Sequence, residues 1–297
     1  GNGNISSRGS STVTWYAHNR PYVINNGAYA ATFEYGPNGN YWKQTATFSN
    51  GSETTRYIGG LMEIVQGPSV TSYRHHINAN GRTVAIYSRG SNGANNTIYP
   101  LNDHLGSTDA VTNSSGTVIV KESFAAFGVR RNGNTWAGAP SGADMTVIGD
   151  STRRGYTDHT MLDNIGLIHM NGRVVDPFVG RFVSPDPFVD GELDTQGWNR
   201  YAYVQNNPLS RTDPSGFVGL TMMRANVSLM TDDRASRHWL EPIHPMERCP
   251  RGTIDCMGKR GFGGGGNDDD RGLDEVVVSA QRDPGVRGGR IGADPDQ

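Results

Sequence analysis

Short runs of alternating polar and apolar residues, rich in Tyr, Thr and Val, fill residues 11–135, and turn-forming pairs separate them. A period of two predicts half-buried strands, and Asn-Gly between two such runs predicts a hairpin with a type I′ turn. The expected hairpins turn at Asn38-Gly39, Asn80-Gly81 and Ser115-Gly116, with a weaker fourth at Asn132-Gly133. Recurrence at roughly 35 to 45 residues predicts an array whose units share their hydrophobic faces.

A stretch rich in Gly, Ala and Pro at 137–143 predicts a loop between this array and a second block at 156–217. The second block is dense in Asp-Pro, Asn-Gly and aromatic residues, which predicts an ordered but irregular structure. Beyond it, 219–239 is expected to hold one short helix. Four consecutive glycines at 263–266 and the acidic residues after them predict a flexible tail.

Composition supports a mainly β protein, because 40 Gly, 15 Pro and 24 Asn among 297 residues disfavour helix. The longest apolar runs, 118–120 and 276–278, are far too short to cross a membrane. A net charge of −2 argues against nucleic acid as the default partner, since phosphate binding needs a basic excess. No export signal opens the chain, so we expect further sequence upstream. Cys249 and Cys256 can form a small disulfide loop in an oxidising compartment or stay as free thiols, so they do not settle the compartment.

Four sequence motifs follow one another in an order that resembles the RHS repeat-associated core family. They are NDHLGSTDAVT at 102–112, GLIHMNGRVVDP at 166–177, GRFVSPDP at 180–187, and NRYAYVQNNPL followed by DPSGF within 199–217. The resemblance covers about residues 30–217 and is firm from residue 98 onward. It leaves the last 80 residues unexplained, which is itself typical of the family.

The resemblance implies a β-strand cocoon built from YD repeats, a core segment that curls in as a plug, and a variable cargo. On this basis we expect YD-type hairpin repeats at 1–136, the plug at 137–217 and a variable tail at 218–297. The implied function is packaging and release of a C-terminal effector in a bacterial competition system. The implied partners are an immunity protein and a secretion-system component, and the implied location is outside the cell or on its surface.

Members of this family cut the cargo from the shell with an internal aspartyl protease, just after the Asp-Pro-x-Gly-hydrophobic element. Matched motif by motif, the family's Arg falls on Arg173, its two aspartates fall on Asp186 and Asp213, and the scissile bond is Phe217–Val218. Two close carboxylates do not both ionise readily, so one keeps a proton while the other activates water.

Two features leave the assembly of this site open. The segment between Asp186 and Asp213 is longer than in insecticidal members, which either lengthens a loop at 189–196 or moves the carboxylates apart. The chain also has fewer repeats than a closed cocoon needs. Two readings therefore stay open: a single-turnover self-protease, and a non-catalytic surface scaffold or carbohydrate- or partner-binding β module in which both aspartates only shape turns.

Histidines and aromatic residues suggest less. No Cys or carboxylate spacing typical of zinc accompanies the histidines, so we predict no metal and no cofactor, and His75 and His76 should face opposite sides of a strand. The histidines considered are His75, His76, His104, His159 and His169. The aromatic residues are expected in the core, with a carbohydrate surface as the alternative: Trp42, Trp136, Trp198, Tyr201 and Tyr203.

The tail leaves a third function open, an active toxin. Its candidate residues are His238, Glu241, His244 and Cys249, but their spacing does not specify a chemistry. An 80-residue tail interrupted by glycines contains little apolar material for a folded enzyme. We therefore expect a degenerate or very small cargo.

Overall fold

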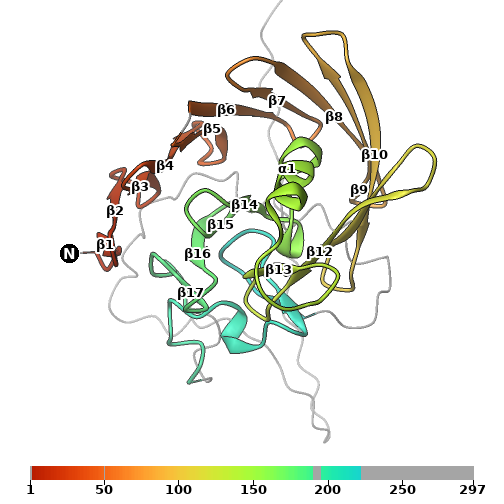
Figure 1. Cartoon of the computed structure of the whole chain (residues 1–297). Coiled ribbons are helices and arrows are strands. Elements are labelled where there is room, and N and C mark those ends of the chain that lie inside the picture. The colour runs from red at the N-terminus through yellow and green to blue at the C-terminus, as the bar shows by residue number, and fades with distance from the viewer. Residues whose placement is uncertain (1, 50, 190–194, 222–297) are drawn as a thin grey trace, which may run out of the picture. The chain divides into compact units, whose positions relative to one another are not determined.

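A computed structural model describes residues 2–49, 51–189 and 195–221. The described chain is mainly β, as the sequence predicts. Thirteen antiparallel strands form one sheet in which every strand pairs with its neighbours in sequence (Figure 1). These strands are β1 (Ser7–Arg8), β2 (Ser11–Trp15), β3 (Pro21–Asn26), β4 (Tyr29–Tyr35), β5 (Tyr41–Phe48), β6 (Gly51–Ile58), β7 (Met62–Gln66), β8 (Thr71–Ala79), β9 (Arg82–Gly90), β10 (Asn95–Asn102), β11 (Thr108–Asn113), β12 (Val118–Phe124) and β13 (Arg130–Asn132).

Three of the expected hairpins form. Strands β8 and β9 turn through Asn80 and Gly81, whose φ angles of 50° and 74° are the left-handed pair that a type I′ turn requires. Strands β4 and β5 turn through Gly39, and β11 and β12 turn through Gly116.

The fourth expected hairpin, at Asn132-Gly133, is wrong. The Asn132 side chain instead accepts hydrogen bonds from the backbone N–H groups of Asn134 (2.9 Å) and Thr135 (3.0 Å). This local side-chain cap ends β13, and the next element in the chain is a helix.

That helix, α1 (Gly142–Ser151), was not predicted, because its start falls in the stretch expected to be a loop. A capping box starts it: the backbone N–H of Asp144 donates to Ser141 Oγ at 3.1 Å, and the backbone N–H of Ser141 donates to Asp144 Oδ2 at 3.2 Å. Ile148 anchors the helix on the sheet, where it joins a core with Ile86, Val111 and other apolar residues.

The second block folds into short, almost fully buried elements on the inner side of the curved sheet (Figure 1). One four-stranded sheet contains β14 (Thr160–Leu162), β15 (Leu167–Met170), β16 (Arg173–Asp176) and β17 (Arg181–Phe182). Two 3₁₀ turns, η1 (Tyr156–Asp158) and η2 (Val204–Asn206), flank it. A two-stranded sheet pairs β18 (Arg211–Thr212) with β19 (Leu220–Thr221).

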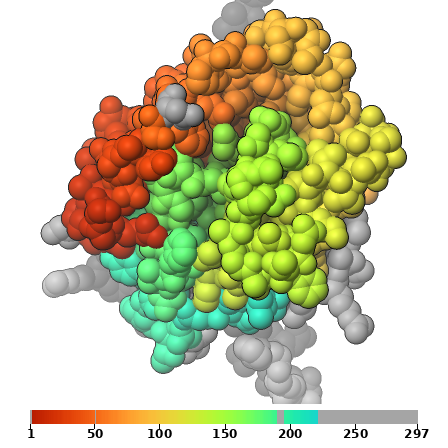
Figure 2. Space-filling view, in the orientation of Figure 1, coloured from red at the N-terminus to blue at the C-terminus, as the bar shows by residue number. Residues whose placement is uncertain are grey.

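Apolar packing fixes the second block against the first strands of the large sheet, and the space-filling view shows the two in contact (Figure 2). Val13, Ile24 and Phe33 from the large sheet share one core with Leu162 and Val174. Burial of each such side chain stabilises the fold by about 1.5–3 kcal/mol.

Hydrogen bonds also join the second block to the strands of the large sheet. Asn164 Nδ2 donates to the backbone carbonyls of Ala30 (2.7 Å) and Thr47 (3.1 Å), and the hydroxyls of Tyr41 and Thr160 lie 2.7 Å apart. The strand array therefore determines where the inner block sits.

Among the aromatic residues, the core expectation is wrong for the three tryptophans. Trp42, Trp136 and Trp198 are 41%, 71% and 62% exposed, whereas Tyr203 is fully buried. His75 and His76 do face opposite sides of β8, since His76 is buried beside Glu63 and His75 is exposed.

The expected tail begins inside the described chain, where 220–221 form a strand. The rest of the helix expected at 219–239, both cysteines and the tail residues His238, Glu241 and His244 lie outside the described residues. In the part that the structure describes, no helix has the length and apolar character needed to span a membrane.

Candidate active site

Arg173 brings the two predicted aspartates together. It is the first residue of β16, and only 4% of it is exposed. Its Nη2 lies 2.7 Å from Asp186 Oδ2 and 3.7 Å from Asp213 Oδ2. Its Nε donates to the carbonyl of Gly216, and its Nη1 donates to the carbonyl of Arg200 at 3.1 Å. The Arg173 guanidinium therefore contacts both carboxylates and also the backbone carbonyls of Gly216 and Arg200.

Asp186 is held by the backbone of the segment around Arg200. The Asp186 N–H donates to the Arg200 carbonyl at 2.8 Å, and Arg200 Nε donates back to the Asp186 carbonyl. Its Oδ1 accepts the N–H of Phe188 at 3.0 Å, as Asp does in an Asx turn. Since both carboxylates contact one nitrogen of Arg173, the longer segment between Asp186 and Asp213 does not separate them.

Asp213 shapes the turn that carries the expected scissile bond. Its Oδ1 accepts the N–H groups of Phe217 and Val218, each at 3.0 Å, and the Ser215 hydroxyl at 3.2 Å. The Asp-Pro-x-Gly sequence suits this turn because Gly216 has a φ of +77°, and a Cβ there would lie 2.1 Å from the Met170 carbonyl oxygen.

Burial sets the charge balance of the site. It raises the pKa of both Asp186 and Asp213, and the Arg173 cation opposes that rise only in part. Burial also lowers the pKa of Arg173 to about 10. The two carboxyls therefore hold a proton more readily than exposed aspartates do, as a carboxyl pair needs for acid–base chemistry.

A second buried side chain, that of His159, hydrogen-bonds to the backbone of this turn. His159 Nε2 lies 2.9 Å from the backbone carbonyl of Asp213. Burial lowers the pKa of His159 to about 4, so the ring is neutral at pH 7 and its Nε2–H donates to that carbonyl.

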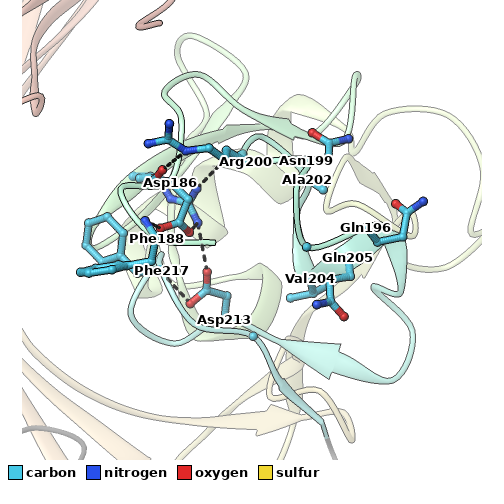
Figure 3. Close-up of a pocket in the computed structure, with 13 residues that line it drawn as sticks. Asp186, Phe188, Gln196, Asn199, Arg200, Ala202, Val204, Gln205, Asp213 and Phe217 are labelled. Carbon is cyan, nitrogen blue, oxygen red and sulfur yellow. Dashed lines mark hydrogen bonds and ion pairs between the residues drawn. The ribbon is translucent and has the colours of Figure 1, made fainter. Parts of the chain in front are cut away.

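A small open cavity lies beside the ion pairs (Figure 3). Asp186, Asp213 and Phe217 line it together with Asn199 and Gln205. The volume open to the centres of water molecules is about 30 Å³, which is enough for about two waters. Water can therefore reach the face of the site where both carboxylates lie.

The sequence did not connect three residues with this site: Arg20, His159 and Gly172. Gly172 follows Asn171, whose φ of 57° places the pair in a tight turn between β15 and β16, and the Asn-Gly pair was the available signal. Arg20 and His159 reach the site from distant parts of the chain, and no local pattern marks them.

Sequence relatives point to one class of protein. No family model matches the chain. It is 30% identical over 224 residues to the tRNA3(Ser)-specific nuclease WapA of Bacillus spizizenii and 29% identical over 226 residues to the tRNA nuclease WapA of Bacillus subtilis (strain 168). Each match covers 72% of the chain, and the chain spans only 9% of the length of either relative. A shorter match, 34% over 86 residues, links it to the toxin subunit YenC2 of Yersinia entomophaga, covering 29% of the chain and 8% of that subunit.

Solved structures define the same fold. The crystal structure of TcdB2-TccC3-Cdc42 superposes with a TM-score of 0.57 at 20% identity. The match covers 70% of the present protein and 10% of the chain in that crystal structure. A Tc holotoxin pore of Photorhabdus luminescens superposes with a TM-score of 0.59 at 19% identity. This match covers 76% of the present protein and 11% of the matched holotoxin chain. The curved strand array with a buried inner block is thus the architecture of an RHS shell.

The chain is an RHS-type protein. Its relatives include the WapA nucleases and the toxin subunit YenC2. Among them, the WapA nucleases match over the greater part of the described residues.

Proposed function

We propose that this chain forms part of an RHS shell that packages an effector and releases it by hydrolysing its own Phe217–Val218 bond. Residues 1–136 supply shell strands, 137–217 form the plug, and 218–297 belong to the cargo. The names of the WapA nucleases and of the YenC2 toxin subunit support the effector role, because each denotes a toxic or nucleolytic protein. An extracellular or cell-surface location and an immunity partner follow from that role.

One observation carries the cleavage proposal. Asp213 Oδ1 is 3.0 Å from the backbone nitrogen of Val218, which is the leaving nitrogen if the chain is cut after Phe217. The other oxygen of the same carboxyl faces the Arg173 nitrogen that binds Asp186. A carboxyl that touches the leaving nitrogen and is coupled to a second carboxyl has the placement that peptide hydrolysis requires.

The chemistry follows from this placement. Asp186, as carboxylate, takes a proton from a water in the adjoining cavity while the water oxygen bonds to the Phe217 carbonyl carbon. Once the attacked carbon is tetrahedral, the Val218 nitrogen has a free electron pair, and Asp213, as carboxylic acid, gives it a proton from Oδ1 as the C–N bond breaks. This step reverses the direction of the resting hydrogen bond, in which the Val218 N–H donates to Oδ1. The products are a carboxyl group on Phe217 and an amine on Val218. Asp186 gains one proton and Asp213 loses one, so the number of protons on the pair is unchanged. Arg173 biases which carboxyl ionises and needs no change of its own charge.

The experiment is the intact mass of the freshly purified 297-residue chain, kept cold and near neutral pH because Asp-Pro bonds also break in hot acid. Asp186→Asn and Asp213→Asn keep the side-chain shape and remove the titrating group. We expect two wild-type fragments that meet at Phe217–Val218 and sum to the 32.1 kDa chain plus one water, and an intact chain in both variants.

A matched control separates catalysis from loss of any Asp-Pro carboxylate. Asp176 also precedes a proline and pairs with Arg8, away from the Asp186–Asp213 pair. Asp176→Asn should cleave as the wild type does. An intact wild-type chain would contradict self-cleavage and favour the scaffold, in which the same residues only stabilise turns.

A further inference from the structure

Phe217 contacts a cation from the strand array as well as one from the site. The Cζ of Arg20, in the loop between β2 and β3, lies 5.2 Å from the centre of the Phe217 ring. The Cζ of Arg173 lies 5.4 Å from the same ring centre. Both distances are within cation–π range. The side chain that precedes the expected scissile bond is therefore held partly by a residue 197 positions earlier in the chain.

Arg20 also binds the turn on which Phe217 rests. Its Nη1 donates to the carbonyl of Gly172 at 2.6 Å and to the carbonyl of Asn171 at 3.1 Å. These two residues in turn hold the Asp-Pro-x-Gly segment, since Asn171 Nδ2 donates to the Pro214 carbonyl at 2.9 Å and the Gly172 N–H donates to the Ser215 carbonyl at 2.8 Å. A continuous chain of hydrogen bonds thus joins the β2–β3 loop to the residues just before the scissile bond.

The 171–172 turn and the Phe217 ring pack so closely that no additional atom fits between them. A Cβ added to Gly172 would lie 2.3 Å from Phe217 Cε2 and 2.6 Å from the Ser215 carbonyl oxygen. Because the ring packs directly on the turn backbone, any displacement of the 171–172 turn displaces Phe217. A misplacement of about 1 Å at a reacting group costs on the order of 100-fold in rate.

We propose that Arg20 is a positioning residue that makes cleavage after Phe217 depend on docking of the β2–β3 loop onto the 171–172 turn. The inference rests on the proposed self-cleavage and adds its regulation. Until the first strands of the array have closed over the inner block, the scissile bond lacks this support and the downstream segment stays attached. The array thereby acts as a folding checkpoint for its own cleavage.

The test follows cleavage of the full chain after pulse-labelled cell-free synthesis. Arg20→Ala removes the contacts with Phe217 and with the 171–172 turn, together with a cation–π contact to Tyr35 at 5.8 Å. Arg20→Lys keeps a charge without the planar group. Arg89→Ala is the matched control, because Arg89 makes the same kind of cation–π contact, 5.8 Å from the Tyr73 ring within the array. We expect Arg20→Ala to slow cleavage about 10- to 100-fold, Arg20→Lys to fall between, and Arg89→Ala to stay within about twofold of wild type.

Two measurements distinguish a positioning role of Arg20 from a general destabilisation of the fold by Arg20→Ala. Guanidinium ion at millimolar concentration should restore part of the Arg20→Ala rate, and the pH midpoints of cleavage should stay those of the wild type because the aspartates are untouched. A rate of Arg20→Ala equal to that of Arg89→Ala would overturn the proposal. So would a loss that neither guanidinium nor Arg20→Lys restores in any part.

Hydrogen exchange keeps this inference distinguishable from the proposed cleavage. In the Asp186→Asn chain, Arg20→Ala should speed amide exchange at Phe217 and Val218, which Asp213 otherwise holds, and Arg89→Ala should not. If the wild type never cleaves but this exchange responds, self-cleavage fails and the positioning role stands. If the wild type cleaves and neither rate nor exchange responds to Arg20→Ala, the positioning role fails and self-cleavage stands.

Discussion

His159 donates a hydrogen bond from Nε2 to the backbone carbonyl of Asp213, 2.9 Å away, and both residues are almost fully buried. This hydrogen bond needs a ring that carries a proton on Nε2. Burial lowers the pKa of the ring to about 4, so the ring stays uncharged until the pH falls to that value. The position of a carboxyl at the candidate site thus depends on a neutral histidine from a distant part of the chain.

Acid should destabilise the fold through two buried histidines. The pKa is about 4 for His159 and about 3 for His169, both below the ordinary value of 6.5 because burial disfavours the charged ring. Between those values and 6.5 the unfolded chain binds more protons, so the free energy of unfolding falls as the pH falls, by about 1.4 kcal/mol per pH unit for each ring.

Urea denaturation at pH 7 and pH 5 measures this loss. His169→Phe, which fits among the rings of Phe33 and Tyr41, should reduce it, and His75→Gln on the exposed side of β8 should not. An unchanged loss in His169→Phe would show that this ring does not contribute.

A buried glutamate should act in the opposite direction. Burial raises the pKa of Glu122, on β12, to about 7, although Glu122 pairs with Arg130 and Arg130 also binds Asp163 at 2.7 Å. The folded chain therefore binds more protons than the unfolded chain between about pH 4.3 and 7, and this stabilisation is lost as the pH rises through 7.

Glu122→Gln removes that dependence. Relative to wild type, the free energy of unfolding of the variant should rise with pH by about 1.4 kcal/mol per pH unit in this window. Urea melts of both chains at pH 5 and 8 give the comparison, and a constant difference between them would contradict the shifted pKa.

Asp213 should have separable structural and chemical roles. Asp213→Asn keeps an Oδ1 that accepts the N–H groups of Phe217 and Val218, whereas Asp213→Ala leaves both without that acceptor. We expect neither variant to cleave, and we expect the alanine variant to be less stable than the asparagine variant by about 1–3 kcal/mol. Intact mass and urea denaturation give the two quantities, and equal stability would mean that the turn does not need the acceptor.

Gly172→Ala should impair cleavage by displacing Phe217, because its Cβ would overlap the ring. Overpacking of this kind costs about 1–3 kcal/mol of stability. Gly142→Ala at the start of α1 is the control, since a Cβ there meets open space. The cleavage rate from pulse-labelled synthesis decides the point, and wild-type cleavage in Gly172→Ala would show that the ring tolerates the shift.

The sequence was sufficient for elements that local rules determine. Asn80-Gly81 formed its hairpin because its left-handed conformation is intrinsic to the pair, and the alternation around it set the register. Asn132-Gly133 did not form one, because the Asn132 side chain caps the strand end instead. Helix α1 was missed although Ser141 and Asp144 form a capping box, since glycine and proline dominate the preceding stretch.

The candidate site needed more than local rules. Arg173, Asp186 and Asp213 came from the ordered motifs of the RHS resemblance, and the structure brings them together. Arg20 and His159 could not be found in that way, because each contacts the site only through the packing of distant segments. Trp42 on β5 was misplaced for a related reason: hydrophobicity alone does not distinguish the inner from the outer side of a curved sheet. Trp136 and Trp198 lie outside the strands, where no alternation predicts a side.

Strand β19 lies just downstream of the expected cut, and Leu220 pairs with Thr212 while Thr221 pairs with Arg211. Hydrolysis after Phe217 breaks a peptide bond that lies between these two paired strands in the sequence, and it leaves their ladder intact. The severed segment would therefore remain as a bound product. Its departure would be a separate event that requires the separation of β19 from β18, so the cleaved chain with its segment still paired and the chain that has lost the segment would be different species.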